Sequence, residues 1–238
     1  MPHTSLEIWF ISTITSFAGK HWLFDTFMGT LSENDLLKGG IFSAILMALW
    51  VADARKGETR ERAGLLLTIL GAAFSVLVSR LGQNLIPNLR PLDNPEVSLL
   101  FPPSFSMYAL GSSWNSFPSD HMALFFSLAS GVFLLKRSWG VFLMVWSLVV
   151  IAFPRVYLGL HYPTDILGGI ALGALSLFIV TKLKGKLLPL AEQMVVFADR
   201  HSFASTALPF LLLFQIATLF NAIRDLGEFV RSLIHSKI

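Results

Sequence analysis

Cysteine is absent from the 238-residue chain, and charged residues are scarce, at 14% of the sequence. Without cysteine, disulfides, thiolate metal sites and a cysteine nucleophile are all excluded. A soluble domain normally carries about a quarter charged residues, whereas 54% of this chain is hydrophobic. The formal net charge of +3 is small and spread along the chain, which argues against a nucleic-acid-binding surface. This composition predicts an all-α integral membrane protein whose main partner is the lipid bilayer.

Apolar runs, separated by short charged segments, divide the sequence into candidate membrane-spanning helices. Five runs are clear, and a sixth is long enough to span the membrane or to lie against the others: Leu36–Ala52, Ala63–Val78, Met122–Leu135, Val141–Phe153, Ile166–Val180 and Ala207–Ala222. We therefore expect a bundle of about six transmembrane helices.

No internal repeat, low-complexity tract or linker interrupts the chain. Residues 1–238 are expected to form a single membrane-embedded domain, with its core at 36–183 and an extra C-terminal apolar segment at 204–223. Leu187–Thr206 is typical of a cytoplasmic or interfacial connection. Residues 1–35 leave three alternatives open: a tilted first span, a re-entrant segment or an interfacial helix. Lys38, near the start of the first clear span, is expected to extend its ammonium group toward the membrane surface.

Basic residues in short loops predict the orientation of the bundle, because such loops lie on the cytoplasmic side of a membrane. Three basic clusters fall on one side of the expected bundle: Arg55, Lys56, Arg60 and Arg62; Lys136 and Arg137; and Lys182, Lys184 and Lys186. The loops Leu81–Pro118 and Pro154–Asp165 then share the opposite side. We expect an inner (plasma) membrane protein of a bacterium, with its active site facing the periplasm or exterior.

The stretch from Pro154 to Asp165 holds Arg155, His161 and Asp165 between two apolar runs. Ionisable residues beside membrane-length segments are costly and mark functional sites by default. The guanidinium fork suits phosphate, and the imidazole can act as nucleophile or base near neutral pH. If the chain is helical there, the carboxylate four residues on can hold the imidazole in one tautomer. The alternative is a polar loop between two spans.

The longer loop contains Arg90-Pro91 and ends with Ser116-Phe117-Pro118-Ser119-Asp120-His121. Pro118 or Ser119 can begin the helix that follows, whose unpaired backbone N–H groups then form an anion site. His121, in the first turn, can protonate a leaving oxygen. Taken alone, the arginine fits a solvated loop residue, and the second motif fits a serine cap beside an uninvolved histidine.

Together these parts predict phosphoryl transfer. Two arginines and a helix N-terminus offer donors for phosphate oxygens, and two histidines offer a nucleophile and an acid on the same membrane face. The sequence contains no P-loop and no carboxylate cluster suited to magnesium, which favours a metal-free reaction. We expect neither a metal site nor a cofactor.

These motifs carry a resemblance to a known family. Arg90-Pro91, then Pro118-Ser119-Asp120-His121, then Arg155 with His161 and Asp165, resemble the three signature motifs of the type-2 phosphatidic acid phosphatase superfamily. The resemblance spans roughly residues 83–165, and the flanking spans fit the six-helix membrane bundle of that family. The second motif is most similar to that of bacterial undecaprenyl-pyrophosphate and related polyprenyl-phosphate phosphatases.

The resemblance implies a role for each motif residue. His161 attacks phosphorus and becomes a phosphohistidine, Asp165 orients it, and His121 protonates the departing lipid oxygen. The implied substrate-binding residues are Gln83, Arg90, Ser119, Asp120 and Arg155.

Three positions depart from the pattern of the family. Asp120 stands where many members have glycine. Gln83 replaces a lysine seven residues before the arginine and brings no charge, which Arg80, one helical turn earlier, is a candidate to supply. Pro154 replaces a serine and removes one hydroxyl donor.

The function so implied is hydrolysis of a membrane lipid phosphate or diphosphate, with undecaprenyl (polyprenyl) pyrophosphate as the expected substrate. Hydrolysis of phosphatidate or phosphatidylglycerophosphate, and transfer of the phosphoryl group to a lipid or sugar acceptor, stay open as alternatives. A catalytically silent lipid-binding protein is the non-enzymatic alternative, favoured only by the neutral Gln83. The oligomeric state is left open.

Overall fold

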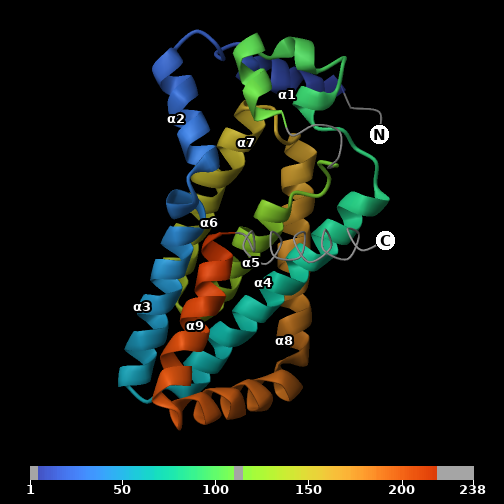
Figure 1. Ribbon diagram of the computed structural model, residues 1–238. Coiled ribbons are helices and arrows are strands. Elements are labelled where there is room, and N and C mark those ends of the chain that lie inside the picture. The colour runs from blue at the N-terminus through green and yellow to red at the C-terminus, as the bar shows by residue number, and fades with distance from the viewer. Residues whose placement is uncertain (1–4, 110–114, 219–238) are drawn as a thin grey trace, which may run out of the picture.

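A computed structural model describes residues 5–109 and 115–218 of the chain. These residues form helices and loops, and no strand occurs among them, in agreement with the all-α prediction. The long helices run up and down between two ends of the molecule (Figure 1). The upper end in this view carries α1, α7 and the start of α8, and the lower end carries the loops between α3 and α4.

The order of the elements follows the sequence pattern closely. Two shorter helices, α1 (Ser5–Thr15) and α2 (Trp22–Glu33), precede a π-helical turn, η1 (Leu36–Gly40), that runs into α3 (Ile41–Arg55). The remaining helices are α4 (Thr59–Leu85), α5 (Asp120–Leu135), α6 (Arg137–Trp146), the π-helical η5 (Ser147–Ala152), α7 (Phe153–Tyr157), α8 (Pro163–Asp199) and α9 (Ser202–Ala217). The long loop between α4 and α5 contains three 3₁₀ turns: η2 (Pro91–Asp93), η3 (Ser98–Leu100) and η4 (Pro103–Tyr108).

Proline explains where two of these elements end or change. Pro87 follows the last turn of α4 and has no backbone N–H with which to continue it. Pro154 lies inside the continuous helical run from α6 to α7, where its ring would clash with a carbonyl one turn earlier. The π-helical turn η5 comes directly before it, and the wider turn accommodates the proline without ending the run.

The centre of the bundle is formed by α4, α5 and α8, which pack against one another more extensively than other pairs. Glycine permits the close approach of α8 to α5. A Cβ atom on Gly169 would lie 2.4 Å from the carbonyl oxygen of Ser119, and one on Gly173 would lie 2.9 Å from the backbone nitrogen of Ser127. Any larger residue at Gly169 must push the start of α5 away from the start of α8.

Four helical segments are long and apolar enough to cross a membrane: Leu36–Arg55, Thr59–Leu85, Arg137–Tyr157 and Pro163–Asp199. They contain four of the five clear spans expected from the sequence. The fifth, Met122–Leu135, lies in the shorter apolar helix α5. Large apolar side chains such as Phe74, Val149 and Phe178 are exposed on the outside of the bundle, as lipid contact requires.

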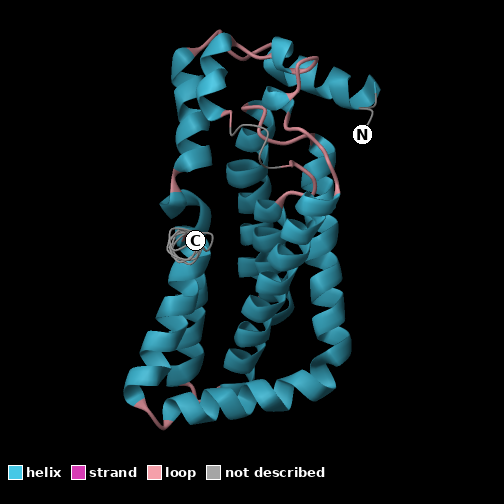
Figure 2. Cartoon of the chain, turned by 45° about the vertical axis from the view of Figure 1, so that its right-hand side comes forward, coloured by secondary structure: helices cyan, strands magenta, loops and turns pink. Residues whose placement is uncertain are grey.

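The N-terminal segment, left open by the sequence, forms α1 and α2, which are too short to be among these four spans. Figures 1 and 2 show α1 lying across the upper end of the bundle. The Thr164 hydroxyl donates a hydrogen bond to Glu7, and the Tyr157 hydroxyl donates one to Asp25. The two helices are therefore fastened to α8 and α7 at the end where the polar loops lie.

The opposite end is closed by the last part of α8, which turns to run across the bottom of the bundle (Figure 2). The predicted connection Leu187–Thr206 is thus largely helical, with Pro189 inside the helix. Arg62 holds the end of α8 through two hydrogen bonds to Asp199, of 2.7 and 2.8 Å, and stacks 4.4 Å above the ring of Trp50.

The predicted span Ala207–Ala222 begins in α9, which packs beside α3. Residues 219–222 of that span, and with them the end of the 204–223 segment, lie outside the described residues. The Ser43 hydroxyl donates a hydrogen bond to the carbonyl of Leu213 and links α3 to α9. Whether α9 spans the membrane stays a prediction.

The orientation predicted from the basic loops is tested by labelling. Single cysteines at Ser104 and Lys184, both exposed, are added to the cysteine-free chain. In intact cells an impermeant thiol reagent should label Ser104→Cys and leave Lys184→Cys unlabelled until the membrane is opened. The reverse pattern would invert the orientation.

Candidate phosphoryl-transfer site

Three distant segments of the chain meet at Asp165, in the first turn of α8. Its carboxylate accepts hydrogen bonds from the backbone N–H of Tyr162 (2.7 Å) and from Nδ2 of Asn88 (3.3 Å). Its backbone carbonyl accepts one from the N–H of Ser119 (3.0 Å). The loop after α4, the start of α5 and the start of α8 are thus joined through a single residue, which is fully buried.

His161, immediately before α8, is buried as well. Its Nδ1 lies 3.4 Å from Oδ2 of Asp165, and its Nε2 lies 3.5 Å from Nη1 of Arg90. A carboxylate beside Nδ1 favours the tautomer protonated there, which leaves the lone pair of Nε2 on the side of the guanidinium. A ring nitrogen with a free lone pair therefore faces a guanidinium, a group suited to phosphate oxygens.

The backbone around His161 explains how the sequence presents it. Gly159 has φ of +70°, and a Cβ atom there would lie 2.8 Å from side-chain atoms of Leu92 and Phe101. This turn therefore requires glycine. The N–H of Leu92 donates to the Gly159 carbonyl, and Nη1 of Arg90 donates to the Leu160 carbonyl at 2.7 Å. These two hydrogen bonds bring the Arg90-Pro91 segment against the turn that carries His161.

Burial of the imidazole lowers the pKa of His161, and the hydrogen bond and charge of Asp165 oppose this shift. The imidazole is accordingly neutral at pH 7 and able to act as a nucleophile. Burial lowers the pKa of Arg90 too, while Asp120 and Asp165 act in the opposite direction. An arginine side chain nevertheless stays charged in a protein.

The second histidine also has a carboxylate partner, which the sequence analysis did not foresee. His121 Nδ1 lies 2.9 Å from Oδ1 of Asp120, and the other oxygen of Asp120 pairs with Nη2 of Arg80 at 2.5 Å. Asp120 had been predicted to bind substrate. Its contacts instead favour a positioning role, because a carboxylate held between a histidine and an arginine repels phosphate. The charge of Arg80, a candidate to replace the missing lysine, is directed to Asp120.

Two further predicted substrate-binding residues shape the loop before α5. Gln83 Nε2 and the Ser79 hydroxyl each donate a hydrogen bond of 2.9 Å to the carbonyl of Pro118. The Ser119 hydroxyl accepts from the N–H of Met122 at 3.5 Å and so caps α5. Gln83 thus fixes the loop, whereas Ser119 lies at a helix N-terminus, where anions are favoured.

Arg155 enters the site from α7 and is buried. Its Nη1 donates to the hydroxyl of Ser32 in α2 at 3.3 Å. The charges of Asp120 and Arg90 both act on Arg155, so the two predicted phosphate-binding arginines lie at the same end of the bundle. Neither Ser32 nor Asn88 was expected from the sequence, since an isolated serine or asparagine in a polar segment carries no signal.

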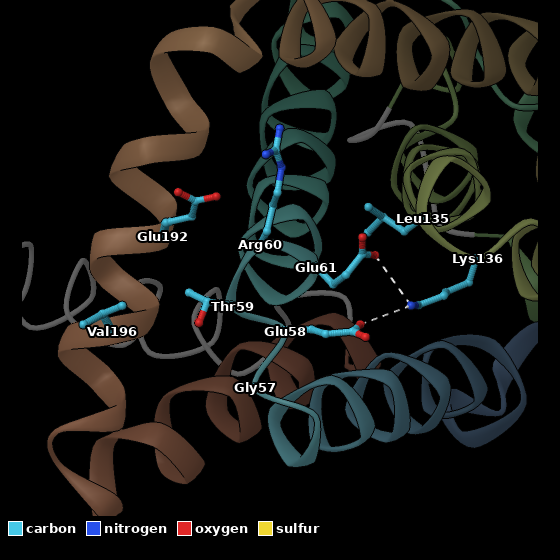
Figure 3. Close-up of a pocket in the computed structure, with 9 residues that line it drawn as sticks. All are labelled: Gly57, Glu58, Thr59, Arg60, Glu61, Leu135, Lys136, Glu192 and Val196. Atoms are coloured by element: carbon cyan, nitrogen blue, oxygen red, sulfur yellow. Dashed lines mark ion pairs between the residues drawn. The ribbon is translucent and has the colours of Figure 1, made fainter.

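An open pocket lies at the other end of the bundle. Its volume is about 800 Å³, and it is bounded by the start of α4, the end of α5 and the last part of α8 (Figure 3). Lys136 lies between Glu58 and Glu61 at its edge, with ion pairs of 3.9 and 3.6 Å. No histidine lines this cavity, and none of the predicted site residues reaches it.

Comparison with known proteins supports the motif assignment. The model of the PAP2 superfamily matches residues 86–188. YbjG of Escherichia coli (strain K12), named as a candidate undecaprenyl-diphosphatase, is 32% identical over 144 residues, covering 60% of this chain and 65% of YbjG. The lipid A 1-diphosphate synthase of the same strain is 30% identical over 167 residues, covering 66% of this chain and 64% of that protein. Each match thus spans less than two thirds of the relative.

A solved structure shares the fold. The crystal structure of Aquifex aeolicus LpxE is similar to this chain with a TM-score of 0.53 and 23% sequence identity, covering 75% of this chain and 96% of the LpxE chain. The matched family region contains Arg90, His121, Arg155, His161 and Asp165, the residues that the fold brings to one end of the bundle. The protein therefore carries a PAP2 superfamily domain at residues 86–188.

Proposed function

We propose that this protein hydrolyses a polyprenyl diphosphate, undecaprenyl pyrophosphate, through a phosphohistidine formed on His161. One observation carries the proposal: the imidazole has a carboxylate beside Nδ1 and the Arg90 guanidinium 3.5 Å from Nε2. This is the geometry of an activated nitrogen nucleophile next to an oxyanion-binding group.

In the first step, Nε2 of His161 attacks the terminal phosphorus. An N–P bond forms while the bond from phosphorus to the bridging oxygen breaks, and Asp165 stabilises the positive charge that develops on the imidazole. Arg90, Arg155 and the N-terminus of α5 bind the equatorial oxygens. Burial and the charge of Arg155 lower the pKa of His121, so His121 takes up a proton as the anionic substrate binds. Held by Asp120, it then donates that proton to the oxygen of the departing polyprenyl phosphate.

In the second step, water attacks the phosphohistidine. His121, now neutral, accepts a proton from the water as its oxygen bonds to phosphorus. The N–P bond breaks, inorganic phosphate leaves, and His161 returns to its starting form. No step of this cycle requires a metal ion.

Two features support a lipid substrate with a long apolar chain. The relative YbjG is named for undecaprenyl diphosphate. An apolar cavity of about 390 Å³ lies between α1, α2 and α7, lined mainly by apolar side chains that include Phe17, Phe24 and Phe153. Tyr157, on the same short helix as Arg155, also lines it, so the cavity lies at the same end of the bundle as the phosphate-binding arginine and has the apolar lining that a lipid tail requires. We place this end of the bundle at the extracytoplasmic face.

A second candidate is transfer of the phosphoryl group to a lipid acceptor. It is favoured by the similarity to a protein named lipid A 1-diphosphate synthase. The phosphohistidine would be the same, and only the group that accepts the phosphoryl would differ.

Phosphate release from purified protein tests the proposal. Undecaprenyl diphosphate should be hydrolysed faster than undecaprenyl monophosphate, phosphatidate, phosphatidylglycerophosphate or lipid A, and His161→Ala should release no phosphate from any of them. Preferred hydrolysis of another lipid would change the substrate, and appearance of a phosphorylated lipid without phosphate release would favour transfer. Lack of turnover with every lipid would favour a silent lipid-binding protein.

The same assay tests the need for metal. Activity should survive exhaustive treatment with EDTA, and vanadate should inhibit as a mimic of pentacoordinate phosphorus. Activity that returns only on addition of magnesium would contradict the mechanism.

The two histidines should differ in their effect on the phosphoenzyme. His161→Ala should abolish acid-labile, base-stable phosphate on the protein, because the nucleophile is gone. His121→Ala should still form it, with a loss of about 10²–10⁴-fold against a lipid monophosphate. The loss should be smaller with p-nitrophenyl phosphate, whose leaving group needs no proton. Rapid-quench labelling that survives in His161→Ala but not in His121→Ala would exchange the two roles.

The role of Asp165 predicts a shift in pH dependence. Because Asp165 raises the pKa of His161 against the effect of burial, Asp165→Asn should lower that pKa further. The acid limb of phosphoenzyme formation should then move to lower pH, while the maximum rate falls by up to about 10⁴-fold. Both proteins are compared with one substrate, so the ionisation of the substrate cancels. An acid limb that moves to higher pH would show that Asp165 does not stabilise the protonated imidazole.

A further inference from the structure

Lys38 is a buried lysine that the proposed mechanism does not use. It was expected to reach the membrane surface, but only 7% of its side chain is exposed. Its ammonium group pairs with Asp35 at 3.1 Å, and the Asp35 side chain is 45% exposed. Burying a lysine costs free energy unless its charge is paired. Asp35 is nearly half exposed to solvent, so its ion pair with Lys38 offsets only a small part of that cost.

The surroundings of Lys38 are those of the phosphate-binding arginine. The helix that precedes it, α2, supplies the Ser32 hydroxyl that accepts from Arg155. Trp146 donates a hydrogen bond of 2.8 Å to the carbonyl of Leu37 and holds η1 against the helix that leads to Arg155. Lys38 interacts electrostatically with both Arg155 and His121. The ammonium group of Lys38 therefore lies near enough to the site for its charge to act on Arg155 and His121. It lies on the side of the site formed by α2 and η1.

Several cations are buried together at this end of the bundle. Lys38, Arg90 and Arg155 are all buried. The carboxylate of Asp120 pairs with Arg80 and His121. The carboxylate of Asp165 accepts hydrogen bonds from the Tyr162 N–H and from the Asn88 side chain. Within the described part of the chain, Nε of Arg90 and Nε of Arg155 are buried without a hydrogen-bond partner. Repulsion among three buried cations with unused donors is relieved by an anion bound between them.

We propose that Lys38 is a substrate-binding residue whose ammonium contacts the phosphoryl group together with Arg155. The proposal rests on the proposed function and adds a third cation to its site, contributed by η1 instead of by α4. Gln83 of α4 is directed at the Pro118 carbonyl and brings no charge to the anion. The first helices of the chain would then complete the site as well as cover it.

The test measures binding of inorganic phosphate and of orthovanadate to the full-length protein by the rise in unfolding temperature with ligand concentration. Lys38→Met removes the charge and keeps an apolar stem. It leaves Asp35 in contact with solvent instead of creating a buried unpaired carboxylate. Affinity for both anions should fall by about tenfold or more, as expected when a charged hydrogen bond is lost.

Lys136→Met is the matched control. Lys136 also pairs with an aspartate, Asp53, at 3.4 Å, but at the opposite end of the bundle. Its loss leaves Asp53, which is only 2% exposed, without its cation, so the unfolding temperature should fall. Anion affinity should nevertheless change by less than about twofold, since additivity holds for distant sites. An equal loss of affinity in both variants would overturn the proposal.

Two further variants keep the test decisive if Lys38→Met fails to fold. Lys38→Arg preserves the charge and should keep anion affinity within about fivefold of the wild type. Asp35→Asn removes the counterion and should tighten anion binding, because Lys38 and Arg155 then have one competitor fewer. Unchanged affinity in Lys38→Met, or weaker binding in Asp35→Asn, would show that Lys38 does not contact the anion.

Failure of the two proposals can be told apart because anion binding requires no turnover. If the wild-type protein binds phosphate through Lys38 but hydrolyses none of the lipids, the role of Lys38 in anion binding is supported and the proposed function is contradicted. If the wild type and Lys38→Met hydrolyse polyprenyl diphosphate with the same KM, only the proposed role of Lys38 is contradicted.

Discussion

The site depends on the way one carboxylate is held. Asp165 accepts hydrogen bonds from the start of its own helix and from Asn88, faces the imidazole of His161, and bonds to Ser119 through its carbonyl. These four contacts come from three segments: the loop after α4, the start of α5 and the turn that leads into α8. A carboxylate in the first turn of a helix is favoured by the unpaired N–H groups and the dipole there. The hydrogen bonds that begin α8 therefore also favour one tautomer of His161, the proposed nucleophile, and join the three polar segments.

The three central helices of the bundle hold Asp165 in place. The centre of the bundle, α4, α5 and α8, carries Gln83, Ser119 and Asp165 at one end, and Arg62 clamps α8 to α4 at the other. The helices α1 and α2 are attached to the site in a different way. α1 and α2 reach the site through the contacts of Glu7, Asp25 and Ser32 with Thr164, Tyr157 and Arg155. Ile11, Met28 and Leu31 of these helices also pack in one buried apolar cluster with Phe101, Phe105 and Tyr157, so apolar burial as well as polar contacts holds α1 and α2 in place.

Much of the site was predictable because its chemistry is local in sequence. The spacing of His161 and Asp165, the proline before α8 and the serine cap of α5 are short-range signals. The balance of charges was not predictable in this way. Asp120 neighbours His121 in sequence, but its pairing with Arg80 arises only when α4 packs against α5. Lys38 resembles a lysine at the end of a span in the sequence, and its burial arises from the packing of η1 against η5. Helix existence was well predicted, whereas boundaries failed where polar residues continue a helix, as at both ends of α4.

The close approach of α8 to α5 has a consequence for how such sequences diverge. Gly169 has no functional group, yet the carbonyl oxygen of Ser119 occupies the place that its side chain would need. Selection acting on catalysis therefore also acts on a position that takes no part in it, and a search for loss-of-function substitutions would find this glycine alongside the histidines. Apolar side chains exposed on the outer faces of α4, α6 and α8 are not packed against the bundle, so they can be exchanged for other apolar residues at little cost. Tolerance to substitution at each position of α8 should consequently depend more on the distance from that position to the neighbouring helix than on its distance from the proposed site of phosphoryl transfer.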